Sequence, residues 1–284
     1  MRGPISMKFW KMHGLGNDYV VIDDRRKRIN DKRLGTLARS LCRRRFSVGA
    51  DGLLVVRNSR IADIRMRIFN SDGSEAEMCG NGIRCFAKYC YENGIVRKRI
   101  MNVETLSGNR RVELKTDRKN ITNVRVNMGP PSFGRESVPM VGQGECIDEP
   151  VTAGDRELRI TCLSMGNPHC VTFVENVKSF PVHEIGPLLE KHAYFPEGTN
   201  VEFVSVVSPQ EIVVRTWERG VGETTACGTG TCASVAAASR LGKTGRRVKV
   251  QLQGGELLVK LGDSVILEGP VEKVFEAELF NGKT

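Results

Sequence analysis

The sequence predicts an α+β protein built from two similar halves, each a β-sheet wrapped around one central helix. Three observations predict this fold class. Polar motifs recur at nearly constant offsets, short β-branched runs fill both halves, and each half carries one helical segment directly after a cysteine.

Short runs of β-branched and aliphatic residues, bounded by Gly, Asn, Asp or Pro, predict strands. These runs are residues 20–22, 53–56, 64–69, 112–114, 171–174, 201–207, 212–216, 248–252 and 257–259. Residues 81–91 and 231–241 have helical patterns, and Gly242 is expected to end the second. Because its segment ASVAAAS carries no charge, we expect this second helix to be buried on nearly every side.

The two halves repeat the same polar landmarks in the same order. The landmarks pair as Asn17 with Asn167, Asn70 with Glu218 and Cys79 with Cys227, at offsets of 150, 148 and 148 residues. Both cysteines stand in a CGxG context that leads into a predicted helix. This pattern indicates an internal duplication, and the Gly- and Pro-rich stretch 128–150 separates the two halves.

Composition is typical of a soluble, folded protein. The 284 residues are 40% hydrophobic, which is enough for one large core or two ordinary ones. No run of eighteen apolar residues or hydrophobic leader is present, so we expect a cytoplasmic protein without membrane attachment. The net charge of +10 includes basic clusters without interleaved aromatics, which favours solvated basic faces that attract an anionic substrate over nucleic-acid binding.

The nine cysteines form an odd set in a chain too large to need disulfides, so reduced thiols are expected. Seven are expected to be small buried hydrophobes: Cys42, Cys85, Cys90, Cys146, Cys162, Cys170 and Cys232. No CxxC occurs, which argues against a structural metal site. The marks of dinucleotide, nucleotide and pyridoxal phosphate sites are also missing, so we expect chemistry without a cofactor.

Cys79 and Cys227 are predicted to be the catalytic pair. Each precedes a Gly-containing turn at the start of a helix, where the positive helix end lowers the pKa of a thiol and binds carboxylates. Inverting a carbon stereocentre requires one acid/base group on each face of that carbon. Two thiols from matching halves meet this requirement if they share one pocket. Backbone N–H groups would then cradle the substrate carboxylate, namely those of Gly80, Asn81, Gly228 and Thr229.

Several polar residues are candidates for binding the rest of a zwitterionic substrate. Arg219 suits a bidentate grip on a carboxylate, and Glu218 suits an ammonium group or a proton transfer, although an exposed charge pair at a strand end is the alternative. His169 either tunes a thiol or is structural. Four asparagines in turn-like contexts either satisfy local backbone or supply neutral donors and acceptors: Asn17, Asn70, Asn167 and Asn200.

Eight segments resemble the diaminopimelate epimerase family, in order and over almost the whole chain. They are FWKMHGLGNDYVVID, GADGLL, FNSDGSEAEMCGNGIRC, TLSG, MGNPHC, GTNVEF, WERGVGETTACGTGTCA and EGPVEKVFEAEL. The resemblance implies two pseudo-symmetric domains, each a mixed sheet rolled around a central helix, with the final strand returning to the first domain. The expected domains are 1–124 plus 272–284, carrying Cys79, and 125–271, carrying Cys227. Residues 1–6 are expected to be an extension outside the fold.

The resemblance also implies a cytoplasmic homodimer that interconverts LL- and meso-2,6-diaminopimelate in lysine biosynthesis. It implies that Cys79 and Cys227 exchange the proton, and that His169 and Glu218 tune these thiols. Substrate contacts are implied for Asn17, Asn70, Gly80, Asn81, Asn167, Asn200, Glu218, Arg219, Gly228 and Thr229. Some family members carry Gln where this chain has Gly52, so that side-chain contact to substrate is expected to be absent here or replaced by water.

Three alternatives remain at this point. A proline or hydroxyproline racemase has the same fold and a two-cysteine mechanism. However, Arg219 and the asparagines suit a substrate with a second, distant charged end better than a compact ring substrate. A non-catalytic thiol redox protein would keep its activity as a Cys79–Cys227 disulfide, whereas an epimerase would lose it. Salt-sensitive retention of DNA or RNA would instead indicate nucleic-acid binding.

Overall fold

The computed structural model describes residues 6–117 and 120–280 and divides the chain into two compact units. The first unit comprises Met1–Val126 and Gly269–Thr284, and the second comprises Asn127–Glu268. Each is a mixed β-sheet around a helix, so the predicted fold class is confirmed. Residues 1–5 of the expected extension lie outside the described residues, whereas Ser6 already begins the first strand.

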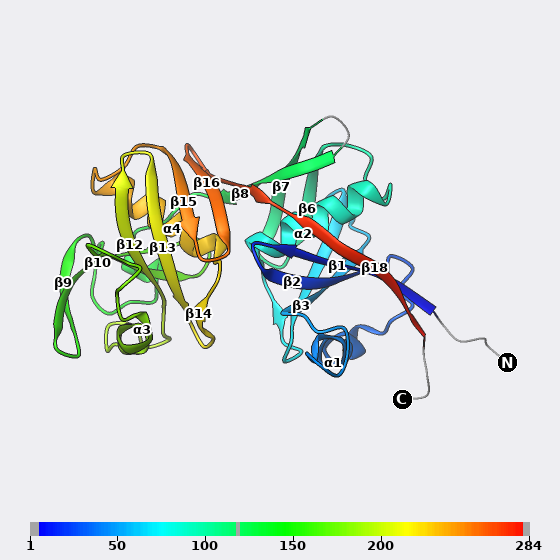
Figure 1. Cartoon of the computed structure of the whole chain (residues 1–284), viewed down its shortest axis with the longest axis horizontal. Coiled ribbons are helices and arrows are strands. Elements are labelled where there is room, and N and C mark those ends of the chain that lie inside the picture. The colour runs from blue at the N-terminus through cyan, green and yellow to red at the C-terminus, as the bar shows by residue number, and fades with distance from the viewer. Residues whose placement is uncertain (1–5, 118–119, 281–284) are drawn as a thin grey trace. The chain divides into compact units, whose positions relative to one another are not determined.

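The first unit holds one sheet with the order β18-β1-β2-β3-β4-β6-β7-β8. Pairs β2–β3 and β4–β6 are parallel, and the others are antiparallel. Its elements are β1 (Ser6–Gly14), β2 (Asn17–Asp23), α1 (Asp31–Cys42), β3 (Gly52–Arg57), β4 (Ile64–Asn70), β5 (Glu75–Ala76), α2 (Gly80–Glu92), β6 (Ile100–Thr105), β7 (Gly108–Asp117), β8 (Asn120–Gly129) and β18 (Glu272–Phe280). Helix α2 packs on the inner face of this sheet and α1 on the outer face of β3 and β4 (Figure 1).

The second unit repeats this plan with the order β9-β10-β11-β12-β13-β15-β16-β17. Its elements are η1 (Arg135–Ser137), β9 (Glu149–Ala153), β10 (Arg156–Ser164), β11 (Pro168–Phe173), α3 (Val182–Glu190), β12 (Asn200–Ser208), β13 (Glu211–Glu218), β14 (Gly222–Thr224), α4 (Gly228–Arg240), β15 (Arg247–Leu252), β16 (Gly255–Leu261) and β17 (Val265–Pro270). A helix links the parallel strands in each unit, as β2-α1-β3 and β11-α3-β12, and the central helix follows the next hairpin. This repetition confirms the predicted duplication.

The predicted elements all correspond to observed ones. Helix α2 begins at Gly80 and α4 at Gly228, one and three residues before the predicted starts. Gly242 follows the end of α4 in a left-handed conformation with φ 67°, which is the predicted stop. Every residue of α4 from Gly230 to Ala238 is buried, as its small side chains predicted. Helices α1 and α3 were not predicted.

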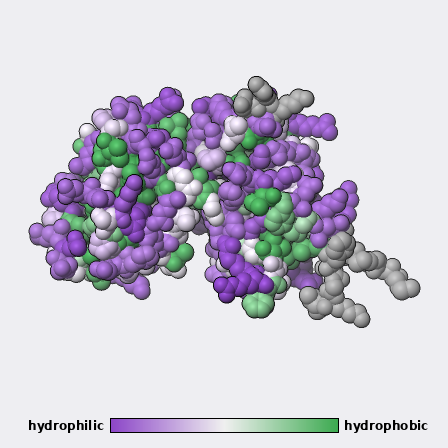
Figure 2. All heavy atoms as spheres, viewed as in Figure 1, coloured by the Kyte–Doolittle hydropathy of each residue, from purple (hydrophilic) through white to green (hydrophobic). Residues whose placement is uncertain are grey.

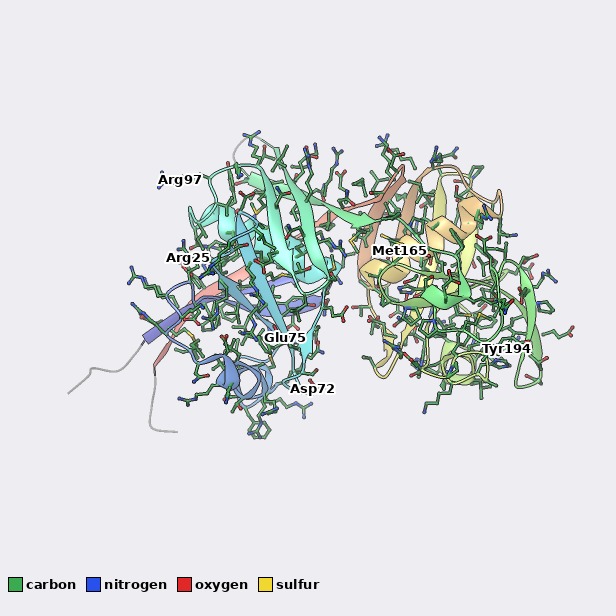
Figure 3. All side chains as sticks on the ribbon, turned by 180° about the vertical axis from the view of Figure 1, so that it is seen from behind. Arg25, Asp72, Glu75, Arg97, Met165 and Tyr194 are labelled. Atoms are coloured by element: carbon green, nitrogen blue, oxygen red, sulfur yellow. The ribbon has the colours of Figure 1, made fainter. Side chains whose placement is uncertain are left out.

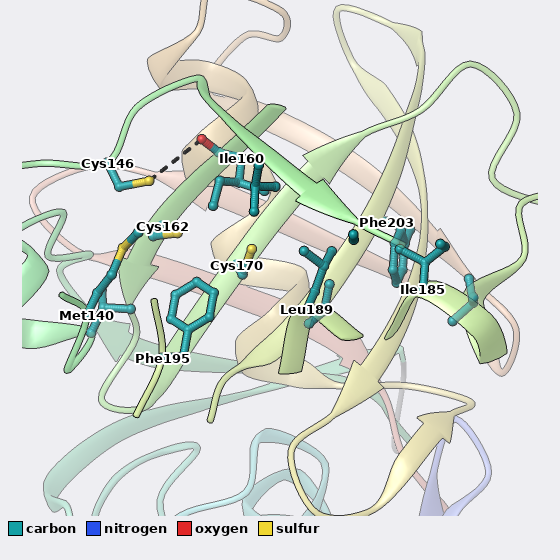
Figure 4. Packing of buried hydrophobic residues seen from close by; sticks show 14 of the residues in the cluster. Met140, Cys146, Ile160, Cys162, Cys170, Ile185, Leu189, Phe195 and Phe203 are labelled. Carbon is teal, nitrogen blue, oxygen red and sulfur yellow. Dashed lines mark hydrogen bonds between the residues drawn. The ribbon is translucent and has the colours of Figure 1, made fainter. Parts of the chain in front are cut away.

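Alternation along the strands of the second unit divides their buried residues between the two faces of the sheet. Cys170, Val201 and Phe203 belong to the hydrophobic cluster that contains Ile185 and Leu189 of α3 (Figure 4). Intervening residues face α4, and they include most of the polar residues singled out from the sequence. Burial raises the pKa of Cys42 to about 11 and that of Cys85 to about 12, so these thiols act as small hydrophobes, as predicted.

The face of the protein seen in Figure 2 is predominantly hydrophilic. Basic clusters at residues 26–28, 43–45, 97–99 and 246–247 are exposed, and Arg25 and Arg97 lie on the outside of the first unit (Figure 3). The basic residues of these clusters are therefore accessible to solvent. Within residues 6–117 and 120–280, none of the helices has the length and apolar character needed to cross a membrane.

Candidate active site

Cys79 caps the N-terminus of α2 in the first unit. Its backbone is extended, with φ −141° and ψ 125°, and its Sγ accepts a hydrogen bond from the Gly82 N–H at 3.5 Å. Gly80 and Asn81 are the first two residues of the helix, where backbone N–H groups point out of the helix end. The predicted placement of this thiol at a helix start is therefore confirmed.

The Asn17 side chain lies beside the Cys79 thiol. Its Nδ2 donates to the Asp51 carboxylate at 2.8 Å, and a carboxylate only accepts, so the orientation of the amide is fixed. Its Oδ1 consequently faces Cys79 Sγ at 3.6 Å and accepts from Asn81 Nδ2 at 3.3 Å. Tyr19 donates to the same oxygen at 2.7 Å. Sequence reasoning missed Asp51 and Tyr19.

Asn70 ends β4 on the same face of the sheet as Tyr19, because Tyr19 is paired with Gly52 and Gly52 with Asn70. The Asn70 amide donates to Ser74 Oγ at 2.9 Å, within its own turn. Asn70 is exposed at the rim of this group, whereas Asn81 is buried within it.

Cys227 caps the N-terminus of α4 in the second unit with the same geometry. Its Sγ accepts from the Gly230 N–H at 3.4 Å and lies 3.5 Å from Thr229 Oγ1. Burial, together with the negative charges of Glu218 and Glu202, raises the pKa of Cys227 well above its ordinary value. The Gly230 N–H at the helix end lowers the pKa of this thiol, as predicted, but loss of hydration and two carboxylates outweigh it, so the net shift is upward.

A chain of hydrogen bonds runs from Cys227 into the interior of the second unit. Asn167 Nδ2 donates to Thr229 Oγ1 at 3.3 Å, and Asn167 Oδ1 lies 3.0 Å from His169 Nε2. His169 Nδ1 in turn lies 2.9 Å from Glu202 Oε1, with both side chains fully buried. His169 therefore reaches its own unit's thiol only through Asn167 and Thr229.

Sequence reasoning also missed Glu202. This carboxylate stands two residues after Asn200 in β12, so alternation places both on the face that α4 covers. Its Oε1 abuts the first turn of α4, where a Cβ added to Gly230 would lie within 2.4 Å of it. The i, i+2 spacing of two polar residues within the apolar segment NVEFV was the available signal.

Glu218, Arg219 and Asn200 form the remaining polar group. Glu218 accepts from Thr224 Oγ1 at 2.6 Å and hydrogen-bonds the Cys227 thiol, and burial raises the pKa of its carboxyl. The Arg219 N–H donates to Asn200 Oδ1 at 3.0 Å, and its exposed guanidinium donates to the backbone carbonyl of Glu197 at 3.2 Å. Glu218 thus touches the thiol directly, whereas Arg219 extends away from it.

The described residues contain no cluster of three or more His, Cys, Asp or Glu side chains placed to hold a metal ion. The ionisable groups beside each thiol are instead engaged with one another and with amides. Each unit therefore carries one thiol at a helix end, held among hydrogen-bonding side chains, and this arrangement suits proton transfer.

Solved structures share the fold over nearly its full length. A phenazine biosynthesis protein of the PhzF family from Bacillus anthracis has a TM-score of 0.72 at 19% identity, covering 97% of this chain and 99% of that one. A hydroxyproline epimerase from Agrobacterium vitis has a TM-score of 0.73 at 14% identity, covering 97% and 93%. At these identities the likeness shows the fold alone.

The family model and the related proteins together define an isomerase of the epimerase class. The family model for diaminopimelate epimerase matches residues 9–134 and 161–274. The chain belongs to the diaminopimelate epimerase family. A relative named diaminopimelate epimerase from Pelotomaculum thermopropionicum is 50% identical over 275 residues, which is 96% of this chain and 98% of that protein. Another, from Methanococcus maripaludis, is 43% identical over 277 residues, covering 96% and 99%.

Proposed function

We propose that the protein interconverts LL- and meso-2,6-diaminopimelate, with Cys79 and Cys227 acting on opposite faces of the same α-carbon. The observation that carries this proposal is the matched geometry of the two thiols, each an N-cap whose Sγ accepts the N–H of the third helical residue. The names of relatives about 50% identical support the choice of substrate.

The two thiols must start in opposite protonation states. Because burial and two carboxylates raise the pKa of Cys227, it enters the reaction as a thiol and serves as the proton donor. Cys79 is then the thiolate base. The α-C–H bond breaks as an S–H bond forms on Cys79, and the Cys227 S–H bond breaks as a new C–H bond forms on the other face. The reverse reaction exchanges these roles.

The Cys227 thiolate left after proton donation meets two hydrogen-bond donors. The Gly230 N–H points at Sγ. The Thr229 hydroxyl lies close to Sγ and has its proton to donate, because Thr229 Oγ1 already accepts a hydrogen bond from Asn167. These donors stabilise the charge that develops during the reaction more than the starting thiol.

The substrate is held by the helix ends and by the polar groups around them. The reacting carboxylate lies against backbone N–H groups of Gly80, Asn81, Gly228 and Thr229, where it gains negative charge as the carbanion forms. The asparagines Asn17, Asn70, Asn167 and Asn200 supply neutral donors and acceptors to the zwitterion. Arg219, with its exposed guanidinium, grips the distant carboxylate, while Glu218 faces an ammonium group.

Thiols supply both proton transfers, so this mechanism uses no cofactor. His169 and Glu218 tune the thiols. We further infer a cytoplasmic homodimer that serves lysine biosynthesis, as the family resemblance implies. Its partner is the small-molecule substrate, and neither nucleic acid nor membrane enters the proposal.

Deuterium exchange tests the proposal. The reduced protein is incubated with LL-diaminopimelate in deuterium oxide, with proline in a parallel sample, and loss of the α-proton signal is followed by NMR. We expect exchange with diaminopimelate only and none for Cys79→Ala. Cys85→Ala, which removes a buried cysteine from the same helix, should retain exchange. Exchange with proline would assign the protein to the racemases, and no exchange with either substrate would refute the two-thiol mechanism.

A further inference from the structure

Tyr19 contacts the Cys79 thiol directly. Its phenolic oxygen lies 2.9 Å from Cys79 Sγ and donates to Asn17 Oδ1 at 2.7 Å. The ring is 4% exposed, so both contacts are shielded from water. A hydrogen bond to sulfur in such a site is stronger than it would be at the surface.

The duplication places Tyr19 at the position that His169 occupies in the second unit. Each lies two residues after an asparagine, at the same offset of 150 residues, and each contacts the Oδ1 of that asparagine. The two rings differ in reach, because Tyr19 touches its own unit's thiol whereas His169 reaches Cys227 through two intervening side chains. The first unit thus carries its own polar ring at this position.

Gly52 makes room for the phenol ring. It is paired with Tyr19 across the parallel strands β2 and β3, and a Cβ at Gly52 would lie 3.0 Å from Cε1 and 3.2 Å from Cδ1 of that ring. The space beside residue 52 is therefore occupied by Tyr19. A side chain at position 52 would press on the Phe69 carbonyl oxygen and on the Tyr19 ring, whose hydroxyl lies against the thiol.

The phenol has one proton and two acceptors within reach. With Cys79 as a thiol, Tyr19 donates to Asn17 Oδ1 and accepts the S–H. With Cys79 as a thiolate, rotation of the hydroxyl directs its proton to sulfur, while Asn81 still donates to Asn17. Burial and the neighbouring Cys79 raise the pKa of Tyr19 well above 10, so the phenol keeps its proton beside a thiolate.

We propose that Tyr19 is a further catalytic residue, a hydrogen-bond donor that stabilises the thiolate form of Cys79. The catalytic part of this inference rests on the proposed function, in which Cys79 is the base. The contact itself does not, because it can be measured without substrate.

The test compares alkylation of Cys79 in Tyr19→Phe and in unchanged protein, both carrying Cys227→Ala. The rate of carbamidomethylation by iodoacetamide is followed across pH, with Cys79 identified by peptide mass spectrometry. Tyr19→Phe removes only the hydroxyl, so we expect the pH of half-maximal rate to rise by about one unit, as a lost hydrogen bond to a charged group predicts. In enzyme that carries Tyr19→Phe alone, the rate of diaminopimelate exchange at neutral pH should fall about tenfold. The difference in rate between this variant and the unchanged enzyme should narrow as pH rises.

Tyr89→Phe is the matched control. Tyr89 is 5% exposed in α2 of the same unit, and its ring packs edge-on against Trp10. Its loss should leave the alkylation profile unchanged. The ionisable groups around the Tyr19–Cys79 pair stay in place in all variants: Lys11, Asp18, Arg44, Asp51, Arg84 and Cys85. They therefore do not contribute to a difference in alkylation profile between the variants and the unchanged protein.

An alkylation profile that is the same for Tyr19→Phe and Tyr89→Phe would overturn the inference. Failure of the proposed function gives a different result, namely no exchange of diaminopimelate by the unchanged enzyme, whatever the alkylation profile. An active enzyme with no shift in the profile refutes only the role of Tyr19.

Discussion

Replacing Gly230 with alanine is expected to destabilise the second unit, whereas the same change at Gly82 in the first unit is expected to be tolerated. The two glycines occupy corresponding positions in α4 and α2, and both donate their N–H to a thiol. A Cβ at Gly230 would lie 2.4 Å from Glu202 Oε1. A Cβ at Gly82 would meet the flexible ends of Leu54 and Ile68, each at 3.3 Å.

The size of the difference follows from these contacts. Overpacking a core costs about 1–3 kcal/mol. If Glu202 turns away, its hydrogen bond with His169 is lost, which for a charged group costs about 1.5–3 kcal/mol. Alanine recovers at most about 1 kcal/mol over glycine in a helix. We therefore expect Gly230→Ala to lower the free energy of unfolding by about 2–4 kcal/mol. Gly82→Ala should stay within about 1 kcal/mol of the unchanged protein.

Thermal unfolding followed by tryptophan fluorescence measures both effects, because Trp10 and Trp217 report on different units. A loss of about 2–4 kcal/mol lowers Tm by roughly 4–16 °C for units of this size. In a Glu202→Ala background the added cost of Gly230→Ala should shrink to that of Gly82→Ala. Equal shifts for the two single variants would show that the Glu202 carboxylate does not lie against α4.

Two further predictions concern the acidic groups near Cys227. In a Cys79→Ala background, Glu218→Gln should lower the pH of half-maximal alkylation of Cys227. Glu202→Gln should lower it by a smaller amount, because the charge of Glu202 contributes less to the raised pKa of Cys227. A midpoint that stays unchanged or rises would contradict the electrostatic account. The pKa of Glu218 is raised above its unfolded value of about 4.5, so the folded protein binds the Glu218 proton more tightly than the unfolded chain does. The contribution of Glu218 to the free energy of unfolding therefore falls as pH rises through the folded pKa. Chemical denaturation at pH 4 and pH 8 should show that Glu218→Gln gains stability relative to the unchanged protein only at the higher pH, and an equal effect at both would refute the sign.

The central helices were predictable because their signals are local. Cys79 and Cys227 are side-chain caps followed by glycine, and α4 is rich in small residues that need no particular partner. The outer helices were missed because each has a glycine in its interior, which lowers helix propensity. Gly35 of α1 lies against the Gly73 carbonyl and Gly186 of α3 against the Trp217 ring, so close packing on the sheet requires these residues. Tertiary contacts override the local preference there.

The site was predicted where a motif recurs and missed where strand register decides the contact. Repetition identified Asn17, Asn167 and both thiols. Asp51 reaches Asn17, and Glu202 reaches His169, only through the parallel pairing of β2 with β3 and of β11 with β12. The raised pKa of Cys227 was also not predictable, because it depends on the depth of burial and on carboxylates from two other strands.

The return of β18 to the first unit has a consequence for synthesis on the ribosome. Strand β1 lies between β2 and β18, and its partner β18 is translated only after the whole second unit. Until then one edge of β1 presents unpaired backbone groups, which can pair with other strands. The second unit, continuous from Asn127 to Glu268, can fold as its own residues emerge. The half that begins the chain is therefore the last to be completed, because β1 gains its second neighbour only after β18 has been synthesised.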